Sequence, residues 1–76
     1  MTFRGRVVRK RVSAGSKHEH DALVLITAEG AEYRLRRQGG NPFRDPELDY
    51  LEGKDIECEG EERNGQIVMT RWELMD

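Results

Sequence analysis

The stretch RRQGGNPFRDPEL, residues 36–48, decides the fold, because it separates one set of β-strand patterns from another. Residues 39–42, Gly-Gly-Asn-Pro, cannot continue a strand ladder, so they end a strand and redirect the chain. Residues 45–47, Asp-Pro-Glu, begin a helix: Asp45 can cap it, proline suits its first position, and acidic residues favour its positive end. Leu48 and Leu51 then lie on one face of a short helix that Gly53 ends.

Upstream of this junction the chain shows three strand patterns. Residues 2–13 are β-branched and charged, and Gly5 inside them predicts a bulge or a sharp bend, which leaves the strand phase between Gly5 and Val8 open. Residues 14–21 are small and polar and predict a loop. Residues 22–29 are apolar at nearly every position, which predicts a strand covered on both sides.

The third pattern, residues 31–37, alternates cleanly. Because successive side chains on a strand point to opposite faces, one face carries Ala31, Tyr33 and Leu35. The opposite face carries Glu32, Arg34 and Arg36.

Downstream of the helix the alternation resumes. Ile56 and Cys58 share one face of a strand, and the other face is acidic, with Asp55, Glu57, Glu59 and Glu61. Asn64-Gly65 predicts a tight hairpin turn, because both residues tolerate positive φ. Residues 66–74 form the last strand, and its predicted phase places together Val68, Thr70, Trp72 and Leu74.

The element order is therefore strand, strand, strand, helix, strand, strand in one domain, residues 1–76. The stretch GKDIECEGEERNGQIVMTRWEL resembles the last hairpin of many small OB domains in its alternating strand, its glycines and its Asn-Gly turn. The resemblance implies a mainly β, five-stranded Greek-key OB-fold-like barrel with one short helix between strands 3 and 4. An SH3-like barrel is the main rival, but it usually lacks a helix at this position.

Two other segments, GSKHEHDALVL and YRLRRQGGNPFRDPEL, resemble those of small bacterial proteins without a known activity. We expect one mixed core in such a barrel. Its predicted members are Val24, Ile26, Tyr33, Leu35, Leu48, Leu51, Ile56, Val68 and Trp72.

Composition narrows the class of protein. Cys58 is the only cysteine, which excludes an intramolecular disulfide and fits a reducing compartment. The chain shows neither a secretory signal nor an apolar run of roughly 20 residues that could span a bilayer, so a cytoplasmic protein with no membrane partner is expected. Length and composition suit a bacterial source.

Charge is divided unevenly along the chain. Residues 1–44 hold ten Lys or Arg and four Asp or Glu, a sum of +6, whereas residues 45–76 hold three and eleven, a sum of −8. Such a division indicates either a basic binding face or pairing of the two halves across neighbouring strands.

Catalytic and metal-binding patterns are weak. Residues 18–21, His-Glu-His-Asp, could bring two imidazoles together on a strand, but two ligands make a poor metal site. Cys58 shares a phase with Ile56 and is expected to be buried. Neither a nucleophile elbow nor a phosphate-binding loop occurs, so we expect no enzyme activity, no metal and no cofactor.

The sequence favours two classes of function, ahead of oligosaccharide or small-ligand binding and of an unrecognised activity. The first is a protein-interaction or scaffold module. The second is single-stranded DNA or RNA binding through a basic face on strands 1 and 3, with Phe43 as a loop aromatic. The oligomeric state stays undetermined, and the candidate ligand-binding residues for either class are Arg4, Arg6, Lys10, Arg34, Arg36 and Phe43.

Overall fold

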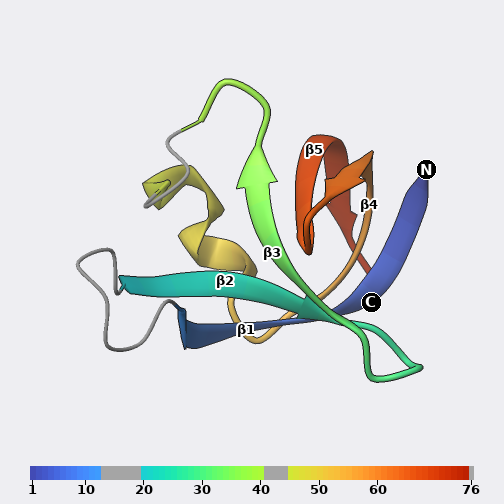
Figure 1. Cartoon of the computed structure of the whole chain (residues 1–76), viewed down its shortest axis with the longest axis horizontal. Helices are drawn as coiled ribbons and strands as arrows, with labels where there is room; N and C mark the ends of the chain where they lie inside the picture. Colours follow the sequence, from blue (N-terminus) through green and yellow to red (C-terminus); the bar gives the residue numbers. More distant parts are fainter. Residues whose placement is uncertain (13–19, 41–44, 76) are drawn as a thin grey trace.

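The computed structural model describes residues 1–12, 20–40 and 45–75 and is mainly β (Figure 1). Its elements, in chain order, are β1 (Thr2–Val12), β2 (His20–Ile26), β3 (Glu32–Arg37), the 3-10 helix η1 (Pro46–Leu51), β4 (Asp55–Arg63) and β5 (Gln66–Leu74). The predicted order of five strands and one helix is confirmed. No helix in these ranges is long and apolar enough to cross a bilayer.

The strands form one sheet that closes on itself in the order β1-β2-β3-β5-β4. Closure depends on β1, which pairs antiparallel with β4 through its first residues and with β2 through the rest. Arg6 is opposite both Asp55 and Ile26, so it marks the point where β1 passes from one partner to the other. β3 and β5 complete the closure as a parallel pair.

Gly5 is next to the residue at which β1 changes partner, and the register shows no bulge there. A Cβ at this position would overlap the carbonyl oxygen of Ile26. The absent side chain therefore allows β2 to approach closely. The phase of β1 follows: Val7 is buried, whereas Arg4 and Arg6 are exposed.

The junction after β3 confirms the predicted helix start, although the helix is of the 3-10 type. Asp45 accepts a hydrogen bond from the backbone N–H of Glu47, and Pro46 occupies the first turn. Leu48 and Leu51 are buried. The helix ends at Leu51, and Gly53 follows with a φ of 81°.

The strand predicted over residues 22–29 is displaced toward the N-terminus: β2 ends at Ile26, because residues 27–30 turn. The backbone N–H of Thr27 donates to Ala31 O, and the Thr27 hydroxyl accepts from the Ala31 N–H. Coverage on both faces is confirmed, since Leu23, Val24 and Leu25 are all buried.

The predicted single phase of β5 is wrong. Ile67 and Met69 are fully buried, whereas Val68 is half-buried and Thr70 is exposed. The register shifts between Glu59 and Gly60, which face Arg71 and Met69, so Thr70 is an extra residue on β5. This β-bulge reverses the phase.

Beyond the bulge, Trp72 returns to the inner face and packs against the core, as predicted. Leu74 shares its phase but is exposed. The Asn64-Gly65 turn is confirmed, with φ values of 53° and 79°.

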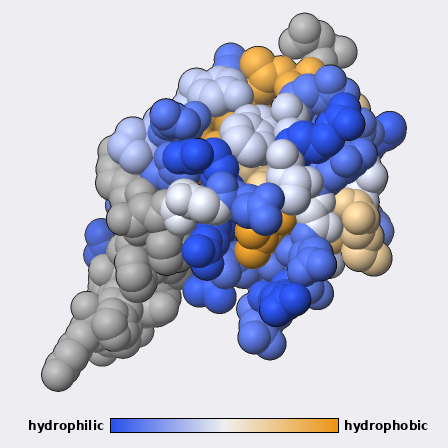
Figure 2. Space-filling model, turned by 90° about the horizontal axis from the view of Figure 1, so that it is seen from above, coloured by the Kyte–Doolittle hydropathy of each residue, from blue (hydrophilic) through white to orange (hydrophobic). Residues whose placement is uncertain are grey.

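Five of the nine predicted core residues are buried, and the other four, Ile26, Tyr33, Val68 and Trp72, are half-buried. Residues missing from the predicted core are Val7, Leu23, Leu25, Ile67 and Met69. The buried position of Cys58 is confirmed. Outside this core, hydrophilic side chains cover most of the face seen in Figure 2, and hydrophobic ones form small separate areas.

Candidate binding surface on strand β3

Arg34 and Arg36 lie on the outer face of β3, as the alternation predicted. Leu35 between them is only 7% exposed and belongs to the core, so its neighbours point away from the core. Both arginines are half-buried. The backbone N–H of Arg34 donates to Gly65 O at 2.9 Å, which holds this part of β3 against the β4–β5 turn.

Val24 forms an apolar base beside Arg34. It lies on β2, opposite Arg34 of β3 on one side and Val8 of β1 on the other. Its phase is opposite to that of Leu23 and Leu25, and it lies outside the core cluster, yet it is only 3% exposed. Outer-face side chains therefore cover it.

A shallow depression of about 490 Å³ lies next to these residues. Val24 and Arg34 line it together with the Lys10–Glu32 pair and the turn residues Asn64 and Gly65. The depression thus brings together a guanidinium, an ion pair and the β4–β5 turn over Val24.

The three predicted basic residues of β1 are engaged in ion pairs. Arg4 contacts Glu57 and Arg6 contacts Asp55, and in both pairs the two residues are directly opposite on β1 and β4. The Arg6 hydrogen bond lowers the pKa of Asp55 and raises the pKa of Arg6. Lys10 Nζ lies 2.8 Å from Glu32 Oε1. Pairing between the two halves of the chain therefore accounts for Arg4 and Arg6, and pairing within the first half accounts for Lys10.

Arg34 and Arg36 differ from the β1 cations. Within residues 1–12, 20–40 and 45–75, the cationic side chains without an ion pair are Arg34, Arg36 and Lys54. Glu32, the carboxylate that shares their face of β3, is paired with Lys10. The Nε of Arg36 is buried and has no hydrogen-bond partner. Apart from this buried Nε, the N–H groups of the two guanidiniums have no acidic partner in the described ranges and can bind an external acceptor.

Aromatic rings in the described part of the chain lie away from this surface. Phe3 and Tyr33 pack together against the core, with ring centroids 5.4 Å apart. The indole N–H of Trp72 donates to the hydroxyl of Tyr50 on η1. Phe43, the predicted loop aromatic, lies outside the described residues.

The remaining predictions about chemistry concern histidine and cysteine. The His18-Glu19-His20-Asp21 cluster falls largely outside the described residues, and Asp21 pairs with Arg11. In the described ranges, no group of three or more His, Cys, Asp or Glu side chains could hold a metal ion. Burial, with a smaller contribution from Glu57, raises the pKa of the Cys58 thiol to about 11, which keeps it protonated at neutral pH.

The sequence indicated Arg34 and Arg36 but not their surroundings. Val24 could not be assigned to the outer face, because residues 22–26 are apolar at every position. Asn64-Gly65 was visible as a turn, but only the register brings it beside β3.

Comparisons with protein-family models, with curated proteins and with solved structures found no match to this chain.

Proposed function

We propose that this chain is a non-enzymatic binding module of the OB type, a Greek-key barrel that recognises an acidic segment of a protein partner on the outer face of β3. The strand order β1-β2-β3-β5-β4 and the position of η1 between β3 and β4 support the OB assignment. The observation that carries the binding site is the pair Arg34 and Arg36, which have no ion pair in the described residues.

The two arginines suit a ligand with carboxylates. Residues i and i+2 of a strand are about 6–7 Å apart, so each guanidinium can take a separate carboxylate, with two hydrogen bonds to each. Val24 lines the depression beside Arg34 but is only 3% exposed, so the guanidiniums carry the recognition. A short segment with two acidic side chains matches this arrangement.

Single-stranded nucleic acid remains the alternative occupant, because the same two guanidiniums also fit successive phosphates. Its support is weaker than that for a protein. Arg4, Arg6 and Lys10 are neutralised by carboxylates, and the described aromatic rings do not form a stacking platform beside Arg34 and Arg36.

The test compares two double variants in fluorescence anisotropy titrations. The probes are a labelled peptide of alternating Glu and Leu and a labelled oligothymidylate, each at low and at physiological salt. For Arg34→Ala/Arg36→Ala we expect peptide affinity to fall by at least about tenfold, the equivalent of one lost charged contact. The matched control is Arg4→Ala/Arg6→Ala, whose arginines are already paired, and we expect it to bind as the wild type does.

Thermal melts of both variants show whether either change affects folding. Equal peptide affinity in the two double variants would contradict the proposal that Arg34 and Arg36 form the binding site. Oligothymidylate binding that is tighter than peptide binding and falls steeply with salt would favour the nucleic-acid alternative.

A further inference from the structure

The second half of β5 has a strand partner on one side only. β3 pairs with β5 as far as Met69, and Gln38 makes the last hydrogen bond there, to Met69 O. β4 continues to pair with β5 as far as Leu74. Residues 70–74 therefore form an open edge of the sheet.

The direction of the backbone groups at this edge follows from one hydrogen bond. The N–H of Met75 donates to Asp55 O. Because hydrogen-bonded and non-hydrogen-bonded pairs alternate in an antiparallel ladder, Glu73 and Arg71 also direct their backbone groups to β4. The N–H and C=O groups of Trp72 and Leu74 then point away from β4, toward the open side, where the described residues provide no backbone partner.

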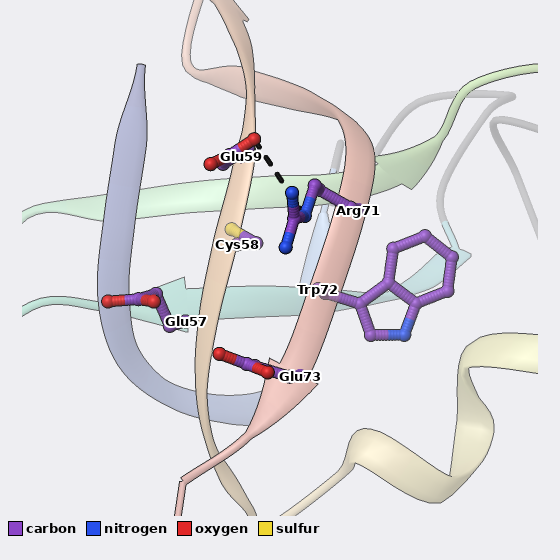
Figure 3. Close-up of a pocket in the computed structure, with 6 residues that line it drawn as sticks. All are labelled: Glu57, Cys58, Glu59, Arg71, Trp72 and Glu73. Atoms are coloured by element: carbon purple, nitrogen blue, oxygen red, sulfur yellow. Dashed lines mark ion pairs between the residues drawn. The ribbon is translucent and has the colours of Figure 1, made fainter.

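Exposed apolar side chains gather beside this edge. Of the four large hydrophobic side chains exposed in the described ranges, Leu74 and Met75 are at its end, and Tyr50 contacts Trp72. The Trp72 indole lies on the side of β5 away from β4 (Figure 3). An open sheet edge with exposed apolar side chains beside it is a typical template for the addition of another strand.

The charges of the edge strand complement one another when the strand meets its own copy. Arg71 and Glu73 are exposed on the outer face of β5, on either side of Trp72 (Figure 3). Arg71 is 3.9 Å from Glu59, at the limit of an ion pair, and Glu73 has no ion pair in the described ranges. A two-fold axis at Trp72 places Arg71 of one copy opposite Glu73 of the other, twice.

We propose that β5 pairs antiparallel with β5 of a second copy of this chain, so that the protein forms a homodimer through residues 70–74. Trp72 then exchanges two backbone hydrogen bonds with Trp72 of the second copy. The backbone groups of Trp72 face the open side, which the two-fold arrangement requires. This dimer does not depend on the proposed function, since Arg34 and Arg36 are on β3.

The experiment measures mass by sedimentation equilibrium from micromolar to millimolar concentration. The wild type is expected to approach twice its 8.8 kDa chain mass. Arg71→Glu and Glu73→Arg each place like charges opposite one another twice, so each raises the dissociation constant by at least about tenfold. The double exchange Arg71→Glu/Glu73→Arg restores opposite charges and recovers the dimer. Arg63→Glu, at an exposed position in the hairpin end, is the matched control and dimerises normally.

Trp72 is the only tryptophan, so its emission reports on the same interface. The wavelength of maximum emission shifts to shorter values with concentration in the wild type and in the double exchange, but not in the single variants. Leu74→Pro provides an independent variant, because it removes an N–H that faces the open side and leaves the hydrogen bonds to β4 intact. We expect it to be monomeric.

Three results would overturn the proposal. One is a wild type that is monomeric at every concentration. Another is a folded Leu74→Pro variant that dimerises as the wild type does. The third is a set of charge variants in which single reversals and the double exchange have the same dissociation constant.

Discussion

Ile67 and Val68 are neighbours of similar chemistry, yet they differ in burial. A shift of one residue along β5 therefore decides which of the two side chains enters the core. Ile67 is fully buried, whereas Val68 is on the other face and half-buried. Both faces of a strand over residues 66–74 would carry apolar side chains, so the sequence alone is compatible with either face pointing into the core. The pairing with β4 decides between them, and that pairing is a tertiary contact.

Substitution of the two residues tests the phase of β5. Ile67→Ala is expected to cost about 2–5 kcal/mol of unfolding free energy, as for other aliphatic side chains truncated in a core. Val68→Ala leaves a smaller and partly solvated gap and is expected to cost less than about 1.5 kcal/mol. Urea denaturation gives both values. Equal losses, or a larger loss for Val68→Ala, would contradict the phase described for β5.

η1 is the element that the sequence predicts best, because the residues that start and orient it are close together in the chain. The Asp-Pro-Glu start and the Leu48/Leu51 spacing predicted its position, and the structure agrees. The partner of the capping residue could not be predicted. Arg37 Nε donates to Asp45 Oδ2 at 2.7 Å, which ties the end of β3 to the helix start.

This tie predicts a loss of stability at low pH. Hydrogen bonds from Arg37 and from the Glu47 backbone lower the pKa of Asp45 below its ordinary value of 3.8. Since the folded-state pKa is lower than the unfolded one, the contribution of Asp45 is complete above pH 3.8 and is lost as the pH falls through the folded-state pKa. Asp45→Asn keeps a capping oxygen but loses the negative charge that binds Arg37, so we expect it to reduce stability at pH 7 by about 0.2–1 kcal/mol.

The stability difference between the Asp45→Asn variant and the wild type should become smaller as the pH is lowered toward 2, because Asp45 of the wild type then loses its charge. Thermal melts across this range measure that difference. Glu29→Gln is a suitable control, because Glu29 is exposed and forms no ion pair within the described residues. A variant whose deficit stays constant from pH 7 to pH 2 would show that the Asp45 charge is not responsible.

At the scale of the whole molecule, the opposite charges of the two halves of the chain meet through the closed sheet. β1 is beside β4, so Arg4 and Arg6 face Glu57 and Asp55. Arg9 extends this pattern to Asp49 and to Glu52 just after η1, and its hydrogen bonds to these carboxylates raise its pKa. The uneven charge distribution therefore mainly provides ion pairs between the two halves of the chain. The sequence alone could not distinguish this role from a basic binding face.

These pairs predict a modest dependence of stability on salt. Exposed ion pairs each contribute about 0–1 kcal/mol, and screening weakens them. We expect the unfolding free energy of the wild type to fall by about 1–2 kcal/mol between very low salt and 0.15 M sodium chloride. Urea denaturation of Arg4→Ala/Arg6→Ala should show a smaller dependence, because two of the pairs are missing. Identical salt dependence in the two proteins would contradict the pairing role.

The closed sheet also constrains the order in which a growing chain can acquire its structure. β1 reaches its partner only when Glu59 and its neighbours exist, because Thr2 is opposite Glu59. The parallel contact of β3 similarly requires Gln66 through Met69. A nascent polypeptide that has left the ribosome as far as β3 can form only the β1-β2-β3 meander, whose inner face lacks its cover. Synthesis of β4 and β5 therefore supplies the missing partners of both β1 and β3. Until then, the β1-β2-β3 meander with its exposed inner face is the form available to a chaperone.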